Sequence, residues 1–406
     1  MKRLFFPNRQ LDQTVIMMVT FADPFDGASF VKLPPHKLIT TQSDWQLCLE
    51  KLHAEPRLAI DLEANSMYAY REEVCLIQIT IPGQDYIIDP LGVRDVTGLG
   101  EIIQDPQVEK VFHAAEYDMI LLKRQFDWQL HNLFDTMWAA RILGYERYGL
   151  ASMIETVYGI ELDKRHQKSN WCKRPLSPEQ LVYAQLDTHH LLDLRDHLEK
   201  ELQTAGRLEE AAETFAEQTH VKLSNNEFDP DNDFWSISGA YDLTRQQQAV
   251  LRALAIYRNH EARQRNRPLF KVFHDKTLIE LAQTTPTSIP ALRDIHGMSA
   301  GQTRRYGRQL LNTIAEGLRA PNPPFPKRPE RLPDDVANRF DKLHTWRKNS
   351  ANARGVESDV IISKDALWAI ALKNPKTEAE ISQLNEIGSW RCKTYAKDIL
   401  AVLRNN

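Results

Sequence analysis

Two pairs of polar residues in this sequence have a spacing that suits chemistry. Asp61 and Glu63 lie two residues apart in the apolar run RLAIDLEA, where a strand would turn both carboxylates to one face. Tyr183 and Asp187 lie four apart in LVYAQLDTHH, on one face of a helix. Close, uncompensated carboxylates repel each other and are costly to desolvate, so a Mg²⁺ or Mn²⁺ ion is the simplest partner. Solvated acids at a strand end, and a structural Tyr–Asp hydrogen bond, are the alternatives.

A further acid, Asp118, follows the strand-like stretch KVFH after a short turn. It lies in the first turn of the helical stretch EYDMILLKRQF, where it would complement the helix dipole even without a ligand. Asp187 is expected to point inward with Leu191 and Leu194, and no Lys or Arg occupies that face at the next turns, so a metal ion would explain it. Asp135 is expected only to cap the helix over 136–143.

The segments that carry these acids alternate between strand and helix patterns. Strands are expected within 57–90, 110–113 and 131–136, and helices over 116–126 and 178–203. This alternation predicts an α/β layer architecture that would bring the acids to one sheet.

After residue 206 the strand patterns disappear and the sequence repeats itself at a shift of 89 residues. The repeat predicts two small all-α domains of one kind, joined by the stiff, proline-rich segment 321–333. Matched pairs at helical spacing include Leu254 and Leu343, Arg258 and Arg347, Ala282 and Ala371, and Tyr306 and Tyr395.

The net charge of −4 hides an uneven distribution. Residues 1–239 carry −15, residues 240–330 carry +8, and residues 331–406 carry +3. An acidic body that holds metal ions and a basic part that holds a polyanion would explain this pattern, and so would ordinary surface variation.

We expect neither a membrane span nor a secretory signal in this chain. No apolar stretch approaches the roughly 18 residues that span a bilayer, and polar residues 7–10 interrupt the apolar start. Cys48, Cys75, Cys172 and Cys392 are scattered without a CxxC pair. We therefore expect neither a zinc site nor a disulfide framework, and a cytoplasmic location.

Three stretches in chain order, AIDLEA, VFHAAEYD and LVYAQLD, resemble the three exonuclease motifs of the DEDD superfamily. The Y-x₃-D form of the third motif marks the tyrosine branch, since the histidine of the other branch would stand where this chain has Val182. The stretches LFDTMWAARILG and LDKRHQKSNWCKRPLSPEQ narrow the resemblance to ribonuclease D, and the two repeats resemble tandem HRDC domains. The resemblance covers residues 37–406.

The resemblance implies an RNase H-like, mixed-sheet exonuclease domain followed by two small all-α HRDC-like domains. The expected divisions are a flexible N-terminal extension at 1–35, the exonuclease domain at 36–205, an acidic helical linker at 206–240, the first HRDC-like domain at 241–320, the proline-rich linker at 321–333 and the second HRDC-like domain at 334–406.

The resemblance also implies chemistry. Two divalent cations, Mg²⁺ or Mn²⁺, would stabilise the attacking and leaving oxygens of an in-line displacement. Their ligands would be Asp61, Glu63, Asp118 and Asp187, and Tyr183 would orient the attacking water. A tyrosine titrates near pH 10, so at neutral pH it would position the water rather than deprotonate it.

The substrate contacts are expected in the basic stretch DKRHQKSNWCKRPL and at the end of KVFH. Lys and Arg bind phosphates and Trp can stack on a base. The candidates are His113, Lys164, Gln167, Trp171 and Arg174. A solvated loop with Trp171 as its packing anchor, and a core histidine at 113, are the alternatives.

In the first HRDC-like domain a basic face is expected to bind phosphates non-specifically, although an arginine-rich exterior without this role is equally compatible. Its residues are Arg258, Arg263, Arg265, Arg267, Lys271, Arg304, Arg305 and Arg308, with Tyr257 and Tyr306 nearby.

The resulting prediction is a monomeric, metal-dependent 3′→5′ exoribonuclease that releases nucleoside 5′-monophosphates from RNA 3′ ends, with tRNA precursors as its substrate class. Two other functions remain open. The first is a 3′→5′ DNA exonuclease of the same superfamily, since no residue here identifies a 2′-hydroxyl contact. The second is a catalytically silent RNA-binding protein, which would require a broken acid set, whereas all four acids and the tyrosine are present.

Overall fold

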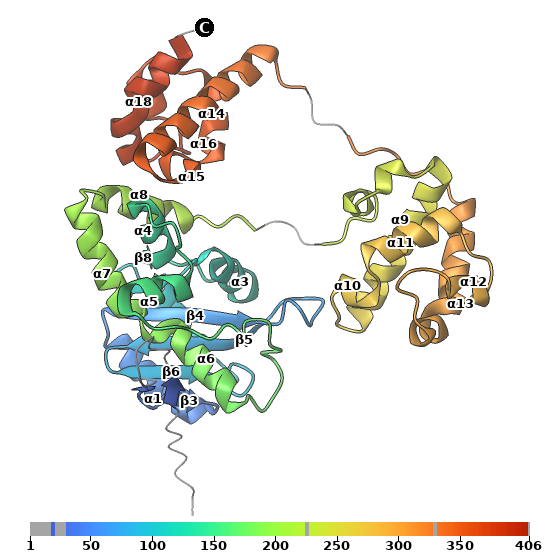
Figure 1. The fold of residues 1–406 in the computed structure, drawn as a ribbon, viewed down its shortest axis with the longest axis horizontal. Helices are drawn as coiled ribbons and strands as arrows, with labels where there is room; N and C mark the ends of the chain where they lie inside the picture. The colour runs from blue at the N-terminus through green and yellow to red at the C-terminus, as the bar shows by residue number, and fades with distance from the viewer. Residues whose placement is uncertain (1–17, 21–29, 224–226, 328–330, 405–406) are drawn as a thin grey trace, which may run out of the picture. The chain divides into compact units, whose positions relative to one another are not determined.

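The computed structural model describes residues 18–20, 30–223, 227–327 and 331–404 (Figure 1). The chain forms two compact units. The first contains the described residues up to Glu63 together with 74–222 and 333–404, and the second contains 64–73 and the described residues of 223–332. Among the helices of the described part, none combines the length and the apolar character needed to cross a membrane.

A mixed, six-stranded sheet forms the core of the first unit, in the order β3-β6-β5-β4-β7-β8. β5 runs antiparallel to β6, while the pairs β3–β6, β4–β7 and β7–β8 are parallel. The expected mixed-sheet α/β domain is thereby confirmed. The strands are β3 (Lys37–Ile39), β4 (Arg57–Ala64), β5 (Val74–Ile81), β6 (Gln84–Ile88), β7 (Glu109–Phe112) and β8 (Leu133–Asp135).

The expected flexible extension at 1–35 falls largely outside the described residues. Within it, β1 (Met18–Thr20) pairs antiparallel with β2 (Phe30–Lys32).

Eight helices of the described chain surround the sheet or follow it. They are α1 (Gln42–His53), α2 (Gly98–Gln104), α3 (Glu116–Phe126), α4 (Thr136–Leu143), α5 (Leu150–Tyr158), α6 (Pro178–His189), α7 (Leu191–Thr204) and α8 (Leu208–Gln218). A capping box formed by Ser177 and Gln180 starts α6, which carries Tyr183 and Asp187 across the sheet.

The single helix expected over 178–203 is wrong, because the chain breaks into α6 and α7 at His190. No Gly or Pro marks this break. Tertiary contacts accompany it: His189 Nδ1 lies 2.8 Å from the Asp85 carboxylate, and the His190 ring stacks on Tyr158 at 5.8 Å. Both contacts join residues distant in sequence, so the helical pattern could not reveal them.

The two expected helical domains are present and repeat each other closely. The first has α9 (Arg245–Gln264), α10 (Leu269–Val272), α11 (Asp275–Thr284), α12 (Ile289–Leu292) and α13 (Ala300–Arg319), after the short 3₁₀ helices η1 (Asp233–Ser236) and η2 (Ala240–Asp242). The second has α14 (Asp334–Arg354), α15 (Ser358–Ile361), α16 (Lys364–Lys373), α17 (Glu378–Ile381) and α18 (Ser389–Arg404). The five α-helices of the first domain and the five of the second start 89 residues apart, pair by pair, which matches the shift found in the sequence.

One internal contact occurs at equivalent positions in both helical domains. Arg258 donates to the Phe273 carbonyl and Arg347 donates to the Ile362 carbonyl, both at 3.2 Å and both from the first long helix of their domain. The two arginines were matched by sequence, and here they have one structural role.

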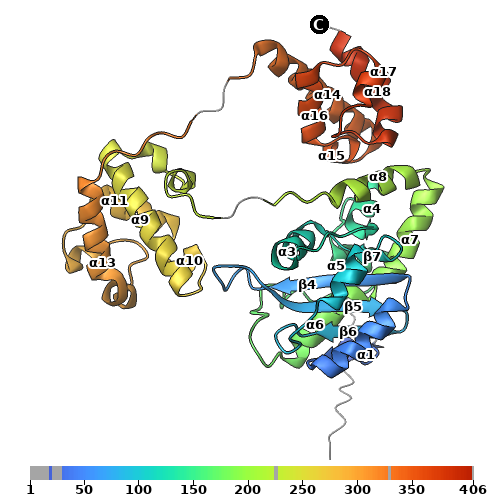
Figure 2. The same ribbon diagram turned by 180° about the vertical axis from the view of Figure 1, so that it is seen from behind.

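The second helical domain packs on α8 within the first unit, and Figure 2 shows α15 beside that helix. Arg354 Nη1 lies 2.6 Å from Glu210 and Arg391 Nη1 lies 3.0 Å from Glu213. The acidic residues of α8 are thus largely neutralised by arginines of this domain.

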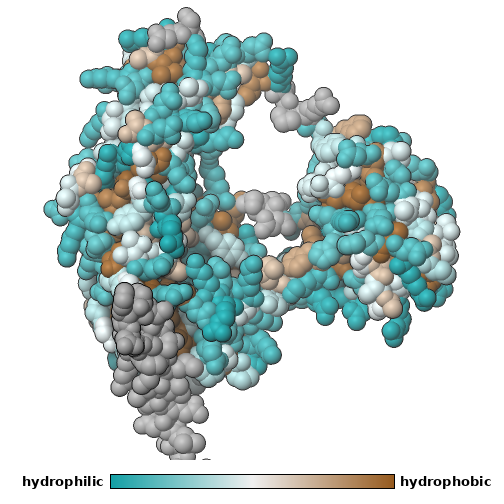
Figure 3. Space-filling view, in the orientation of Figure 1, coloured by the Kyte–Doolittle hydropathy of each residue, from teal (hydrophilic) through white to brown (hydrophobic). Residues whose placement is uncertain are grey.

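The first helical domain forms the second unit together with the loop 64–73 that leaves β4. The Tyr70 hydroxyl donates to Asn259 at 2.6 Å, and the Tyr70 backbone N–H donates to the Asn266 side chain at 3.0 Å. Lys271 Nζ lies 3.9 Å from the centre of the Tyr68 ring. The visible face of this unit is mostly hydrophilic, with scattered apolar patches (Figure 3).

Candidate active site

The end of β4 and the middle of α6 bring three acids together. Carboxylate oxygens of Asp61, Glu63 and Asp187 all lie within 4.8 Å of one another, which is close enough to share a metal ion. All three side chains are half-buried, so protein atoms crowd them while some contact with solvent remains. The i, i+2 spacing in the strand and the inward face of α6 account for this convergence.

These carboxyls are held in an environment that disfavours their ionised forms. Burial, followed by the charges of Asp61 and Asp187, raises the pKa of Glu63 to about 10. Burial also raises the pKa of Asp61, and burial followed by the charge of Asp61 raises that of Asp187. Such a cluster needs either protons or cations, and an all-oxygen donor set of this kind fits Mg²⁺ or Mn²⁺.

Asp118 faces this group without belonging to its tightest part. It lies in the first turn of α3 and is buried. Burial raises its pKa, and the charges of Asp61, Asp135 and Asp187 raise it further, so its carboxyl lies within electrostatic range of the cluster. Asp118 therefore lies near the group of three acids without being one of its members.

Asp135 organises the turn that presents Asp118. It caps α4 by accepting from the Met137 N–H at 2.9 Å, as expected from the sequence. Its carboxylate also accepts from the backbone N–H groups of Ala114 and Ala115, at 3.1 and 2.9 Å. Ala114 has a φ of 64°, a backbone conformation that non-glycine residues rarely adopt. No sequence signal indicated this second role.

Tyr183 stands beside the acids as a neutral phenol. Its ring packs against Trp171 and His166, with centroids 5.8 and 6.2 Å away. Burial raises its pKa, and the charges of Asp187 and Glu63 raise it further. Within the residues that the structure describes, no hydrogen bond joins Tyr183 to Asp187. The structural Tyr–Asp hydrogen bond considered from the sequence is therefore not found.

Trp171 does not offer the exposed stacking face expected from the sequence. Its side chain is 1% exposed and packs with Leu76 of β5 and Ala184 of α6. The contact with Tyr183 makes Trp171 a support for that ring rather than a platform for a base. Aromatic type alone does not separate these roles, because both burial and stacking use the same ring face.

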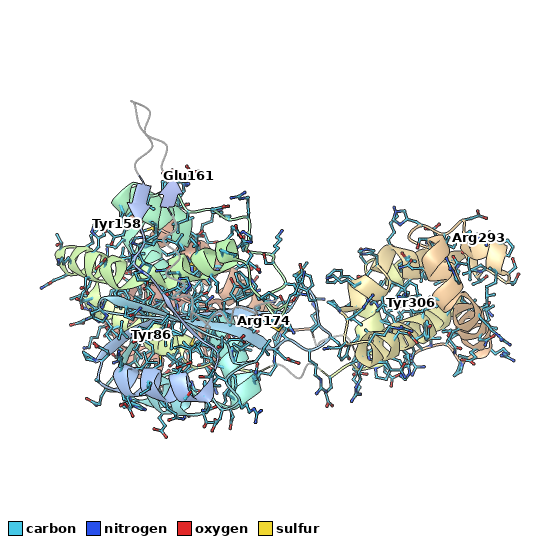
Figure 4. All side chains as sticks on the ribbon, turned by 90° about the horizontal axis from the view of Figure 1, so that it is seen from below. Tyr86, Tyr158, Glu161, Arg174, Arg293 and Tyr306 are labelled. Carbon is cyan, nitrogen blue, oxygen red and sulfur yellow. A yellow bond between two sulfur atoms is a disulfide. The ribbon has the colours of Figure 1, made fainter. Side chains whose placement is uncertain are left out.

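Arg174, which is labelled in Figure 4, is hydrogen-bonded to other groups of the protein. Its Nε and Nη2 donate to both oxygens of Asp89, at 2.6 and 2.7 Å, and Nη2 donates to the Cys75 carbonyl at 2.7 Å. A guanidinium engaged in this way holds the loop on the sheet, and its expected role as a phosphate contact is not supported.

A disulfide between Cys75 of β5 and Cys172 fastens the same loop. The expectation of free, scattered cysteines is wrong for this pair and holds for Cys48 and Cys392. The partners are separated by 97 residues, so only the packing of the loop against β5 brings them together.

The remaining expected substrate residues differ in their exposure. Lys164 and Gln167 are exposed on the loop before α6. His113 lies just after β7, and its Nδ1 is 2.9 Å from the Thr136 hydroxyl. Burial lowers the pKa of His113 to about 4, so the ring is neutral. All three remain candidates for contacts with substrate.

Most of the expected basic face of the first helical domain is exposed. Arg258 is the exception: it is 7% exposed and pairs with Asp275 at 2.6 Å. Arg265 and Arg305 lie over the Tyr306 ring, at 5.4 and 5.9 Å from its centre. The exposed cations are Arg263, Arg265, Arg267, Lys271, Arg304, Arg305 and Arg308.

Comparison with known proteins supports the class that this fold and this acid cluster indicate. Residues 36–203 match the 3′-5′ exonuclease family model, and residues 247–314 and 336–403 each match the HRDC domain model. Ribonuclease D of Gluconacetobacter diazotrophicus is 33% identical over 379 residues, which cover 91% of this chain and 93% of that protein.

Solved structures agree. The catalytic core of RRP6 from Trypanosoma brucei is 28% identical, with a TM-score of 0.64 over 70% of this chain and 80% of that one. Escherichia coli RNase D shares the fold at 24% identity, with a TM-score of 0.65 over 92% of this chain and 99% of that one. The protein is therefore a 3′-5′ exonuclease by class. More narrowly, the chain belongs to the ribonuclease D family of 3′-5′ exoribonucleases.

Proposed function

We propose that this protein is a two-metal 3′→5′ exoribonuclease that shortens structured RNA 3′ ends, with tRNA precursors as its substrate class. The observation that carries the proposal is the convergence of Asp61, Glu63 and Asp187, with Asp118 in range and a neutral Tyr183 alongside. The products would be nucleoside 5′-monophosphates. We also propose the domain limits that the sequence predicts, with the exonuclease domain at 36–205 and the two helical domains at 241–320 and 334–406.

The four acids would hold two divalent cations, Mg²⁺ or Mn²⁺. When bound, such cations stabilise charge at the scissile phosphate and make hydroxide available near neutral pH. The raised pKa values of Glu63 and Asp187 support this assignment, because an uncompensated cluster would otherwise stay protonated.

Tyr183 would orient the attacking water through its hydroxyl. The pKa of the phenol lies above its ordinary value, so the group keeps its proton and donates or accepts a hydrogen bond without acting as a base. Trp171 and His166 limit the positions of the ring. The disulfide at Cys172 and the clamp at Arg174 hold the loop that carries Trp171, so they support Tyr183 indirectly.

Substrate binding would combine two basic regions. Lys164 and Gln167 would contact the 3′ end near the acids, and the neutral His113 would contact the scissile phosphate or sugar. The exposed cations of the first helical domain would hold the phosphates of the RNA body, with strong salt dependence. The E. coli relative is described as an exoribonuclease involved in structured RNA processing, which supports this substrate class.

We further propose that the protein acts as a monomer in the cytoplasm, where tRNA precursors are found. The Cys75–Cys172 bridge would have to survive in that reducing compartment. Thiol alkylation of the protein in intact cells, followed by mass spectrometry, measures whether it does.

One experiment tests the proposal. The purified protein is incubated with a 3′-extended tRNA and a sequence-matched DNA, each with Mg²⁺, with Mn²⁺ and with EDTA. We expect metal-dependent release of nucleoside 5′-monophosphates from the RNA. Preferential trimming of the DNA would indicate a DNA exonuclease, and no release from either strand with either metal would indicate a binding protein.

A further inference from the structure

The helix α4 joins the second helical domain to the turn that follows β7. Arg141, in the last turn of α4, donates from Nε to Glu357 at 3.0 Å and from Nη2 to both carboxylate oxygens of Asp359 at 2.7 Å. The guanidinium carbon of Arg141 lies 4.0 Å from the centre of the Trp138 ring and 5.4 Å from that of the Tyr148 ring. Two carboxylates and two aromatic rings therefore fix this planar cation, which arginine is shaped to allow.

Two further contacts hold the same end of α4 to the second domain. The Tyr148 hydroxyl donates to Glu357 at 3.0 Å, and Arg354 Nη2 donates to the Ile142 carbonyl of α4 at 3.2 Å. The Arg141 side chain is 10% exposed, whereas its two carboxylate partners are about half exposed. Arg141 is therefore the desolvated member of this group, and it depends on the second domain for its counter-charges.

The other end of α4 holds the segment 112–115, which lies directly before α3. The carboxylate of Asp135, the N-cap of α4, accepts from two backbone N–H groups of this segment at 3.1 and 2.9 Å. The Thr136 hydroxyl donates to a backbone carbonyl of the same segment at 3.0 Å and lies 2.9 Å from His113 Nδ1. Since Asp118 lies in the first turn of α3, these hydrogen bonds set where its carboxylate lies.

The helix between these two ends is short and has no ready place to bend. α4 contains eight residues, Thr136–Leu143, and spans roughly 12 Å at the helical rise per residue. Its sequence, TMWAARIL, has neither Gly nor Pro, where sharp kinks usually occur. A shift of the end that contacts the second domain would therefore also move the end that holds the segment 112–115.

We propose that Arg141 is a positioning residue of the candidate active site, held by Glu357 and Asp359 of the second helical domain. Through α4 it fixes the segment 112–115, and with it the carboxylate of Asp118. The inference rests on the proposed two-metal function. It gives the second helical domain a part in catalysis that needs no contact with RNA, unlike the basic face of the first domain.

The test uses the full chain and a short RNA oligonucleotide, so that binding of long RNA does not enter. The double variant Glu357→Gln, Asp359→Asn removes both charges that hold Arg141 and keeps the side-chain volumes. Glu217→Gln is the matched control, because this carboxylate is similarly exposed, at 40%, but joins the second domain to α8 through Arg391, at 3.1 Å. The measurements are kcat, KM, the Mn²⁺ concentration for half-maximal turnover, and the melting temperature.

We expect the double variant to lower kcat about tenfold with KM within about twofold of the wild type, because misplaced catalytic groups slow the chemical step. Half-maximal turnover should need more Mn²⁺, since Asp118 is a proposed ligand. Arg141→Gln should lower kcat as much, and adding it to the double variant should lower kcat no further, because the three residues act through one contact. Glu217→Gln should leave kcat unchanged.

A purely structural contact would lower the melting temperature and leave kcat unchanged in assays well below that temperature. A kcat within about twofold of the wild type in the folded double variant therefore overturns the inference, and so does an equal loss of kcat in Glu217→Gln. If the double variant does not fold, Arg141→Lys, which keeps the charge and loses the fork, decides by the same measurements. A wild-type protein that trims no RNA with Mg²⁺ or Mn²⁺ would instead overturn the proposed function.

Discussion

The two helical domains share one fold and use its surface differently. After the first long helix of each domain, the backbone turns at a residue with positive φ, which is Asn266 in the first domain and Gly355 in the second. The preceding arginines, Arg265 and Arg354, are equivalent by the 89-residue shift. Arg265 is exposed and pairs with Glu261 of its own helix at 2.8 Å, whereas Arg354 pairs with Glu210 of α8.

Other equivalent positions follow the same trend. Lys271, an exposed cation of the first domain, corresponds to the buried Val360. Gln302 corresponds to Arg391, which is 3% exposed and bonded to Glu213 and Glu217. The second domain therefore uses this face to pack against the exonuclease domain. The first domain keeps the cations Arg265 and Lys271 exposed at these positions, and we propose that non-specific RNA contacts are made there.

The largest effect should come from substituting one of the clustered acids, because these residues would act in catalysis and belong to neither helical domain. Asp187→Asn should lower kcat by about 10³-fold or more, because it removes a ligand charge at the cluster where phosphate charge would develop. RNA affinity, measured by fluorescence anisotropy, should change little. Asp196→Asn, on the neighbouring α7, serves as the control. Near-normal turnover of the Asp187→Asn variant would show that Asp187 does not belong to the catalytic site.

The second domain should respond strongly to loss of Arg391, the most deeply buried of the three buried arginines that the structure describes there. Arg391→Met removes the guanidinium that pairs with Glu213, and breaking a buried ion pair typically costs about 3–5 kcal/mol. Chemical denaturation followed by circular dichroism measures the free energy of unfolding. The equivalent change in the first domain, Gln302→Met, removes one neutral hydrogen bond to the Val272 carbonyl and should cost about 1 kcal/mol. Equal losses would contradict the proposed difference between the domains.

Substitutions on the basic face of the first domain should change RNA affinity rather than the free energy of unfolding. The triple variant Arg304→Ser, Arg305→Ser and Arg308→Ser should flatten the plot of log affinity against log salt by about 2, since each single-strand phosphate contact contributes about 0.7. Turnover of a short oligonucleotide should persist. Lys393→Ser with Lys397→Ser, at the positions equivalent to 304 and 308, should leave the salt dependence unchanged, and a matching loss there would assign RNA binding to both domains.

The smallest effect should appear in the pH dependence of the metal-free protein. A carboxyl whose pKa is higher in the folded than in the unfolded state stabilises folding while protonated, and this stability is lost as pH rises through the folded value. For Asp61 and Glu63 the loss begins above about pH 4 and continues through pH 7 toward pH 10.

Scanning calorimetry in EDTA should therefore show a melting temperature that falls by roughly 3–6 °C between pH 5.5 and 8. Saturating Mn²⁺ should remove most of this fall, because cations replace the protons. Glu63→Gln should flatten the profile without metal. A melting temperature that rises over this range would mean that the acids are not held in the unfavourable environment described here.

Much of the fold and the acid set was predictable from sequence. The pattern RLAIDLEA specifies a buried strand with two acids on one face, and the Tyr183–Asp187 spacing specifies one face of a helix. The internal repeat was visible because its matched residues recur at a fixed shift, and the helix starts reproduce that shift. These are local or periodic properties, which depend on neighbours in the chain.

What the sequence determined by itself was therefore the order of elements, the acids on their inward faces and the doubled helical domain, since hydrophobic period and spacing express them directly. Only the tertiary structure decided which of the expected substrate residues and cysteines are available to a ligand: it buried Trp171, paired Arg174 with Asp89 and joined Cys75 to Cys172. The physical reason is that burial and pairing depend on contacts between residues about 85 to 100 positions apart, and no local pattern reports them.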